Sequence, residues 1–445
     1  NFKDLTPSLS EIFFPRLFSR AIISSPGIRG AYVLGIQNRE GLNMADRGMD
    51  RRDFMKSTAA GLSGFVFLSA NEKKPEEASK KPAKEQKFIY RTLGKTGIRL
   101  PAINMGVMNS SNPNLVRAAL NSGMVLLDTA TTYQRGTNET MIGEVVKERP
   151  RDSYVIATKA HPPEDRSTGL YTKEATEEDY GKKIDASLKN LGLDHIDIYH
   201  HHGASRRESV LYEPVMRALE KAKKAGKIRF TGISTHRNEP EVIQAAVDSR
   251  FYDVILTTYN FKQQHQVEIR EGIARAAAAG MGVIVMKAMG GVRLQERAEK
   301  PVDPVPALKW VLQDPNVHTI IAGFTTFDQM TLDLSVMENP VLTNDEKARL
   351  QMAALQPGLY CQGCGQCLGQ CRRGLPIPDL MRAYMYVYGY QNLSHSQDLL
   401  LSLNLPPRVC GECGTCPVTC SIGFDVSRRI RDVARLRDVP AEFIA

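Results

Sequence analysis

Eight short runs rich in β-branched residues alternate with amphipathic stretches along the middle of the chain. The runs cover residues 103–107, 125–130, 153–160, 196–202, 228–235, 254–260, 282–288 and 318–324. Amphipathic stretches such as 137–149, 176–191, 212–226, 239–249 and 264–279 are long enough to cross back over a parallel sheet. An open doubly wound sheet usually has fewer strands and a glycine-rich phosphate loop, and no GxGxxG motif follows Val107. The pattern therefore predicts an α/β fold, a (β/α)8 TIM barrel.

The chain is longer than such a barrel requires, at 445 residues, so we divide it into five segments. They are an N-terminal extension (1–43), a signal region (44–70), a linker (71–87), the barrel (88–345) and a cysteine-rich domain (346–445). Two β-rich pieces around Gly94 to Gly97, within residues 88–103, predict a hairpin that closes the bottom of the barrel.

The signal region begins with two arginines. Residues 51–56 read RRDFMK, and an uncharged, moderately apolar stretch of 14 residues follows at 57–70. This order resembles a twin-arginine signal, with Met44 or Met49 as the candidate start, although an arginine pair before a buried helix is the alternative. We expect export through the twin-arginine translocase, to the periplasm or to the outer side of the inner membrane. Residues 71–87 contain six Lys, four Glu and no large apolar residue, which predicts a disordered linker.

The net charge of +9 does not indicate a nucleic-acid partner. Lys and Arg are spread along the chain without interleaved aromatic residues, which favours a solvated basic surface. We therefore expect no nucleic acid among the partners.

Polar residues at strand ends are the candidate catalytic groups, because chemistry in a barrel collects at the C-terminal ends of its strands. Asp128, Lys159 and His202 end the second, third and fourth predicted strands, and Tyr133 follows the second. Carbonyl reduction needs a proton donor, and a tyrosine can serve if a buried cation lowers its pKa. We expect Tyr133 to donate the proton and Lys159 to lower its pKa. Asp128 would keep Lys159 charged, and His202 would hydrogen-bond the carbonyl oxygen.

The segments around these four residues resemble motifs of a known family. LLDTATTY, VIATKA and LDHIDIYHHHG look like the motifs that carry the Asp-Tyr-Lys-His tetrad of aldo-keto reductases, and GTNETMIGEVVKE resembles the helix after the tyrosine. The resemblance covers roughly residues 88–340 and implies interconversion of a small-molecule carbonyl and an alcohol. With the cysteines and the twin arginine, the chain resembles an iron-sulfur-containing branch of that family.

Neighbouring histidines are expected to differ in role. Strand alternation places His200 on the inward face with His202 and turns His201 into the helix layer, which predicts a structural role for His201. His236 resembles a serine-x-histidine pattern of the iron-sulfur-bearing members, and a cofactor contact and a structural loop histidine both remain open for it.

The resemblance implies NADP or NAD as cofactor, yet several expected contacts are replaced. The family often uses a Ser-Asn pair, a Gln and a stacking Tyr where this chain has Ser234 with Thr235, Leu256 and Met286. Gly323 and Gln329 stand where Lys and Arg often bind the 2′-phosphate. The candidate cofactor-binding residues are Ser234, Thr235, His236 and Lys287. The replaced contacts argue against tight NADP binding, and the choice between NADP and NAD stays open.

All eight cysteines lie after residue 360, in two runs spaced CxxCxxCxxxC. Three thiolates at this spacing can bind one corner of a 4Fe-4S cluster, and the fourth reaches the other cluster in two-cluster ferredoxins. We expect Cys361, Cys364, Cys367 and Cys420 to hold one cluster, and Cys410, Cys413, Cys416 and Cys371 to hold the other. Four disulfides and zinc sites are the alternatives. The spacer between the runs has helical character and resembles an α-helical ferredoxin-like domain.

These features together predict an exported oxidoreductase in which two clusters exchange electrons with a redox partner protein. Two other readings remain open: an electron-transfer protein with the barrel as a docking scaffold, and a non-redox epimerase or lyase that uses Tyr133 and Lys159.

Overall fold

The computed structural model describes residues 88–165, 168–291, 303–355, 358–411 and 413–444. Eight parallel strands close into a barrel in the order β10-β11-β12-β3-β4-β5-β8-β9, which confirms the predicted fold. They are β3 (Ile103–Gly106), β4 (Leu126–Asp128), β5 (Val155–Ala160), β8 (Ile196–His201), β9 (Ile228–Thr235), β10 (Val254–Thr258), β11 (Gly282–Met286) and β12 (Thr319–Ala322). Each lies within the run predicted for it. The signal region, the linker and the N-terminal extension fall outside the described residues.

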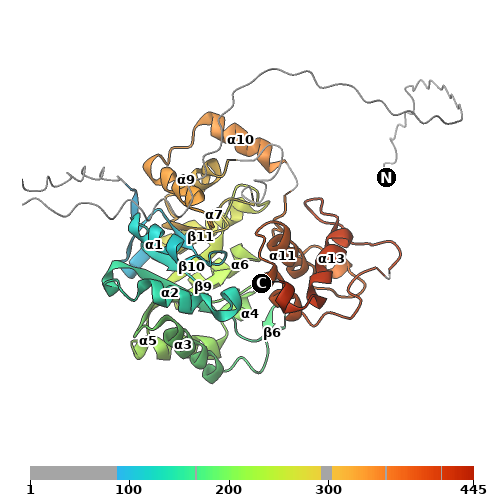
Figure 1. Ribbon diagram of the computed structural model, residues 1–445, viewed down its shortest axis with the longest axis horizontal. Helices are drawn as coiled ribbons and strands as arrows, with labels where there is room; N and C mark the ends of the chain where they lie inside the picture. Colours follow the sequence, from blue (N-terminus) through green and yellow to red (C-terminus); the bar gives the residue numbers. More distant parts are fainter. Residues whose placement is uncertain (1–87, 166–167, 292–302, 356–357, 412, 445) are drawn as a thin grey trace, which may run out of the picture. The chain divides into compact units, whose positions relative to one another are not determined.

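Helices surround these strands (Figure 1). They are α1 (Pro113–Asn121), α2 (Asn138–Val146), α3 (Glu177–Leu191), α4 (Arg207–Val210), α5 (Glu213–Lys224), α6 (Glu239–Ser249), α7 (Gln266–Ala278), α8 (Val305–Leu312) and α9 (Phe327–Glu338). Their apolar faces pack on the outer side of the strands, where residues such as Ile156, Tyr199 and Val283 are fully buried. Within the described residues, no helix is long and apolar enough to cross a membrane.

The predicted hairpin is present and closes one end of the barrel. β1 (Tyr90–Thr92) pairs antiparallel with β2 (Arg99–Pro101). Leu93 and Leu100 pack with Leu126, Ile198 and other inward-facing strand residues in a single apolar cluster. The turn fits tightly, because a Cβ atom on Gly94 would lie 2.4 Å from the backbone nitrogen of Gly282.

The cysteine-rich segment forms a small helical module. Its helices are α11 (Ile377–Tyr388), α12 (Leu393–Leu401) and α13 (Val426–Ala434), and Leu380, Leu400 and Ile430 lie in their shared apolar core. α10 (Asn344–Ala354) instead packs its Leu350 with Ala307 of α8. The barrel and this module fall within one compact unit of the described residues, so the predicted division at 345/346 stays a prediction.

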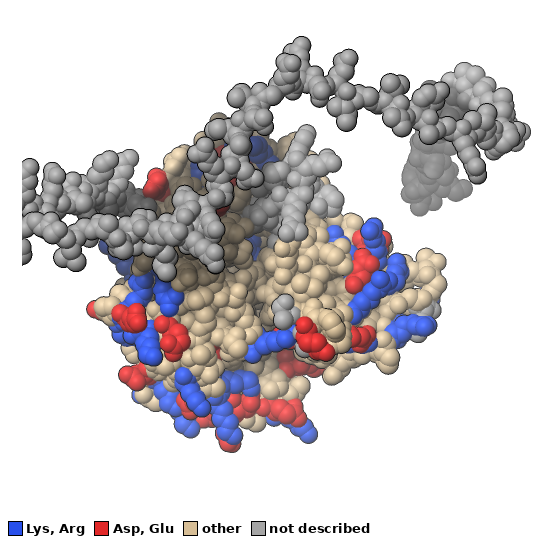
Figure 2. Space-filling view, in the orientation of Figure 1, with Lys and Arg blue, Asp and Glu red and all other residues tan. Residues whose placement is uncertain are grey.

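Charged side chains of both signs lie interspersed on the face of the molecule shown in Figure 2. Many form ion pairs along or between helices, such as Lys182 with Glu178 and Arg207 with Asp248. The absence of a nucleic-acid partner stays a prediction.

Candidate active site

Four polar residues meet at the C-terminal ends of the strands. Asp128 ends β4, Lys159 lies near the end of β5, His202 follows β8, and Tyr133 begins a 3-10 helix after β4. The ammonium of Lys159 donates to Asp128 Oδ1 at 2.5 Å and to the carbonyl of Thr129 at 2.7 Å. Both side chains of the ion pair are almost fully buried. Parallel strands end at one rim, which is why residues far apart in sequence meet here.

Tyr133 lies above this ion pair, with Lys159 Nζ 4.9 Å from the centre of its ring. The pKa of Tyr133 is raised well above its usual value by burial, and further by Asp128, Tyr386 and Tyr390. This differs from the expectation that Lys159 lowers it. Burial is the largest cause of this shift, and the ion pair with Asp128 offsets part of the Lys159 charge. Tyr133 is therefore held as a protonated phenol.

His202 is held as a neutral imidazole. Burial lowers its pKa well below 6.5, and the neighbouring His161 and Lys159 lower it further. Its ring stacks on His161 at 3.7 Å between centroids and meets the edge of Tyr133 at 6.4 Å. A neutral imidazole can donate one hydrogen bond to a bound carbonyl oxygen without carrying a charge.

The other two histidines of this strand lie as strand alternation predicts. His200 points inward, and its ring fits only because residue 232 is glycine, since a Cβ there would lie 2.2 Å from Nδ1. His201 points into the helix layer, where its ring nitrogens hydrogen-bond the hydroxyls of Tyr171 and Tyr252. These contacts support the structural role expected for His201.

The four candidate cofactor residues divide into two pairs. Ser234 and Thr235 are buried; Ser234 Oγ accepts from the amide of Gly203, and Thr235 Oγ1 donates to the carbonyl of Arg237. Neither lines the large cavity at the barrel mouth. His236 and Lys287 both line it and share a 3.0 Å hydrogen bond.

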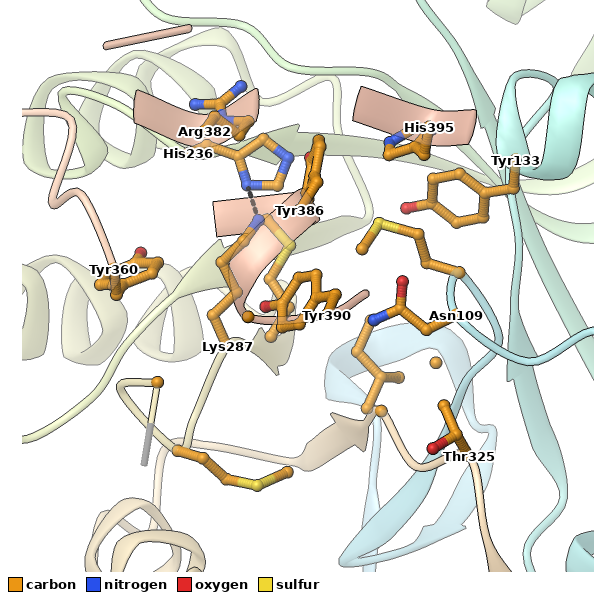
Figure 3. A pocket seen from close by; sticks show the side chains of 18 of the residues that line it. Asn109, Tyr133, His236, Lys287, Thr325, Tyr360, Arg382, Tyr386, Tyr390 and His395 are labelled. Carbon is orange, nitrogen blue, oxygen red and sulfur yellow. Dashed lines mark hydrogen bonds between the residues drawn. The ribbon is translucent and has the colours of Figure 1, made fainter. Parts of the chain in front are cut away.

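This cavity has a volume of about 560 Å³ and is lined by both the barrel and the cysteine-rich module. Asp128, Tyr133 and His202 line it from the barrel, and helices α11 and α12 and their connection supply further lining residues. Figure 3 shows several of these side chains around the cavity. The lining side chains from the module include Tyr360, Arg382, Tyr386, Tyr390 and His395. The ring of His395 lies 6.0 Å from that of Tyr133 and 4.6 Å from that of Tyr386. Sequence reasoning missed these residues, because no local pattern indicates that the module covers the barrel mouth.

A second, much smaller cavity lies among the cysteines. Cys361, Cys364 and Cys367 of the first run line it together with Cys420 of the second. Cys364 Sγ lies 3.4 Å from Ser421 Oγ, and Gln370 accepts a hydrogen bond from the amide of Thr419, so the two runs lie side by side. All eight cysteines are free thiols. In the described part of the chain, no three His, Cys, Asp or Glu side chains are close enough to hold a metal ion as they stand.

Comparison with known proteins identifies the barrel. Residues 105–307 match the aldo/keto reductase family. The oxidoreductase YqkF of Bacillus subtilis is 24% identical over 296 residues, 59% of this chain and 95% of its own length. The L-glyceraldehyde 3-phosphate reductase of Escherichia coli is 30% identical over 180 residues, and the chain spans 50% of that relative.

A solved structure shows the same fold. The aldo-keto reductase of Bacillus halodurans in its holo form superposes with a TM-score of 0.50 at 23% identity, covering 62% of this chain and 99% of its own. The family match ends at residue 307, before the cysteine-rich module begins. Residues 105–307 are therefore similar to an aldo/keto reductase family domain, and relatives named as oxidoreductases and dehydrogenases support an oxidoreductase enzyme.

Proposed function

We propose that the protein interconverts a small-molecule carbonyl and an alcohol at the barrel mouth, with Tyr133, Asp128, Lys159 and His202 as its catalytic residues. The observation that carries this proposal is the buried Asp128–Lys159 ion pair beneath Tyr133, facing the same cavity as His202. Residues of this kind in this arrangement suit a reaction in which a carbonyl oxygen gains a proton.

In the reducing direction, the carbonyl carbon gains a hydride and its oxygen gains a proton from Tyr133. His202 donates a hydrogen bond to that oxygen and stabilises the charge that develops on it. Lys159, fixed by Asp128, places a positive charge under the phenol and stabilises the tyrosinate left after proton transfer. The module above the cavity limits access of water to these groups.

A nicotinamide, when bound, supplies or accepts the hydride, and the aldo/keto reductase family generally uses NAD(P)H. Its fit to this chain is partial. His236 faces the cavity and would hold it, together with Met286 and Gln329, which also line the cavity. Lys287, the other candidate that lines the cavity, hydrogen-bonds His236 on the side of Arg382. Ser234 and Thr235 use their hydroxyls within the protein and do not line the cavity.

We also propose that the module holds two 4Fe-4S clusters, which supply single electrons in exchange with a redox partner protein. The repeated cysteine spacing supports this, as does the small cavity that Cys420 shares with the first run. The free state of the cysteines and the helical core of the module suit cluster ligands better than disulfides. Export by the twin-arginine route is part of the same proposal, since that route carries folded proteins and rests on Arg51 and Arg52.

Replacement of one hydroxyl tests the catalytic proposal. Tyr133→Phe in the cluster-loaded chain should lower the rate of aldehyde reduction by about 10² to 10⁴, the usual contribution of general acid catalysis. Tyr252→Phe is the matched control, because Tyr252 is also buried but hydrogen-bonds the carbonyl of Val210 in the helix layer. Steady-state rates with small aldehydes and NADPH or NADH provide the measurement. Full activity of the Tyr133 variant would favour a docking scaffold or a non-redox reaction instead.

A further inference from the structure

Two half-buried basic side chains on one side of the cavity, Lys287 and Arg382, have no hydrogen-bonded acidic partner in the part of the chain that the structure describes. Lys287 hydrogen-bonds only the neutral ring of His236, and no carboxylate pairs with it among the described residues. The guanidinium of Arg382 has its ion-pair partner, Asp379, at 3.8 Å, beyond hydrogen-bond distance. Asp379 is also shared with Arg237, at 3.7 Å. Two guanidinium groups thus share one carboxylate, so this arrangement has excess positive charge.

Glu239 of the barrel offsets only part of this excess charge. It raises the pKa of Lys287, but burial, Arg382 and Lys159 lower that pKa more. Glu239 is fully buried and already accepts hydrogen bonds from Thr258, Gln263 and His265. The remaining positive charge faces the cavity, which both Lys287 and Arg382 line.

The backbone of Lys287 has an unfavourable conformation, which the surrounding structure must hold in place. Lys287 has a φ of 54°, in the left-handed region that favours glycine. A side chain held in such a conformation at a cavity is a candidate functional group. Burial lowers the pKa of Lys287 well below its usual value, and the nearby Arg382 and Lys159 lower it further. An anion beside Lys287 would reverse this effect and draw a proton onto the amine.

We propose that Arg382 and Lys287 form a subsite for a carboxylate group of the substrate. The planar fork of a guanidinium can donate two parallel hydrogen bonds to a carboxylate, and the ammonium adds a third. Arg382, His236 and Lys287 lie together on one side of the cavity, and Tyr133 lies across it (Figure 3). The substrate would therefore be a carbonyl compound whose carboxylate lies some bonds away from the reacting carbon. This inference rests on the proposed function only for the reacting end of that molecule.

Equilibrium binding tests the subsite without turnover. We would titrate the cluster-loaded chain with 5-oxopentanoate and with its uncharged methyl ester, by calorimetry at pH 8. The wild type should bind the acid more tightly than the ester. Arg382→Gln should weaken binding of the acid by about 10- to 100-fold, the loss expected for hydrogen bonds to a charged group, and should leave the ester unchanged. Binding of the acid should also take up a proton, seen by comparing buffers of different ionisation enthalpy, and Lys287→Met should abolish that uptake.

Controls separate this subsite from other effects. Arg437→Gln serves as the matched variant, because Arg437 lies in the same module at 16% side-chain exposure, against 18% for Arg382, and does not line the cavity. It should bind the acid as the wild type does. Equal affinity of wild type for acid and ester would overturn the proposal. If Arg382→Gln weakened NADPH and the acid equally, the anion held here would be the dinucleotide diphosphate, which would also overturn it. Tyr133→Phe should still bind the acid, so failure of the catalytic proposal would leave this result intact.

Discussion

At the scale of single residues, burial determines the protonation state of the histidines in and around the site. Burial lowers the pKa of His200 and of His201 to about 3, and burial with nearby Lys287 and Arg382 lowers that of His395 to about 4. These rings are therefore neutral in the folded protein at neutral pH. Of these three rings, His395 lines the cavity, as do His202 and His236, whose pKa values burial also lowers. Neutral imidazoles there can exchange hydrogen bonds with a substrate without adding to the excess positive charge.

Acid stability follows from these values. A pKa below that of the unfolded chain, about 6.5, means that the unfolded state binds more protons as the pH falls. The contribution of His201 is thus fully present above pH 6.5 and is lost toward pH 3, at about 1.4 kcal/mol per pH unit. His201→Gln should flatten the fall in the free energy of unfolding between pH 6 and pH 4, measured by urea titration.

His265 contributes to the pH dependence of the free energy of unfolding with the opposite sign. Its pKa is raised by the hydrogen bond to Glu239, so its contribution is fully present below pH 6.5 and is lost as the pH rises through the folded value. His265→Gln should change the pH dependence above 6.5 and leave the acid slope of the wild type. For His201, the free energy of unfolding should fall less steeply between pH 6 and pH 4 in His201→Gln than in the wild type. Identical slopes would contradict the assignment of His201 as a buried neutral ring.

At the scale of elements, the hairpin and the barrel are joined by a tight turn. Gly94 has a φ of 52°, and a Cβ there would lie 2.4–2.5 Å from the backbone of residues 280–282. Gly94→Ala should lower the free energy of unfolding by about 1–3 kcal/mol or more, because the backbone it meets cannot move aside. Gly97 has a φ of 74° but nothing within 4 Å, so Gly97→Ala should cost only the backbone strain, about 1–2 kcal/mol. Equal stability of the two variants to heat or urea would show that the contact between the Gly94 turn and the start of β11 does not stabilise the fold.

Sequence periodicity predicted the elements well because each strand is specified by its own residues. The predicted ends were less accurate: the strand within the run at 125–130 ends at Asp128 in the structure, and a 3-10 helix begins at Tyr133. That Asp128, Lys159 and His202 lie at one rim was also predictable, because barrel strands end at a common rim. Arg382, Tyr386 and His395 were not, because their place in the site depends on how the module packs against the barrel. The orientation of the Ser234 and Thr235 hydroxyls likewise depends on partners distant in sequence.

At the scale of the whole molecule, each iron-sulfur cluster is expected to bind three cysteines of one run and the last cysteine of the other run. The cluster-loaded protein should contain about eight iron and eight sulfide per chain. Cys420→Ala should remove the same electron paramagnetic resonance signal as Cys361→Ala, because Cys420 shares a cavity with the first run. Cys371→Ala and Cys410→Ala should remove the other signal. If Cys420→Ala instead matched Cys410→Ala, each run would bind its own cluster.

The covering of the barrel mouth by residues 360–402 has a consequence for how the protein is made. A ribosome finishes the barrel strands before it reaches these residues, since β12 ends at Ala322. A nascent chain can therefore close its barrel while the cavity still opens to solvent on one side. The complete cavity exists only after residues 360–402 have left the ribosome and packed, so synthesis itself orders the steps: the barrel first, the covered site afterwards.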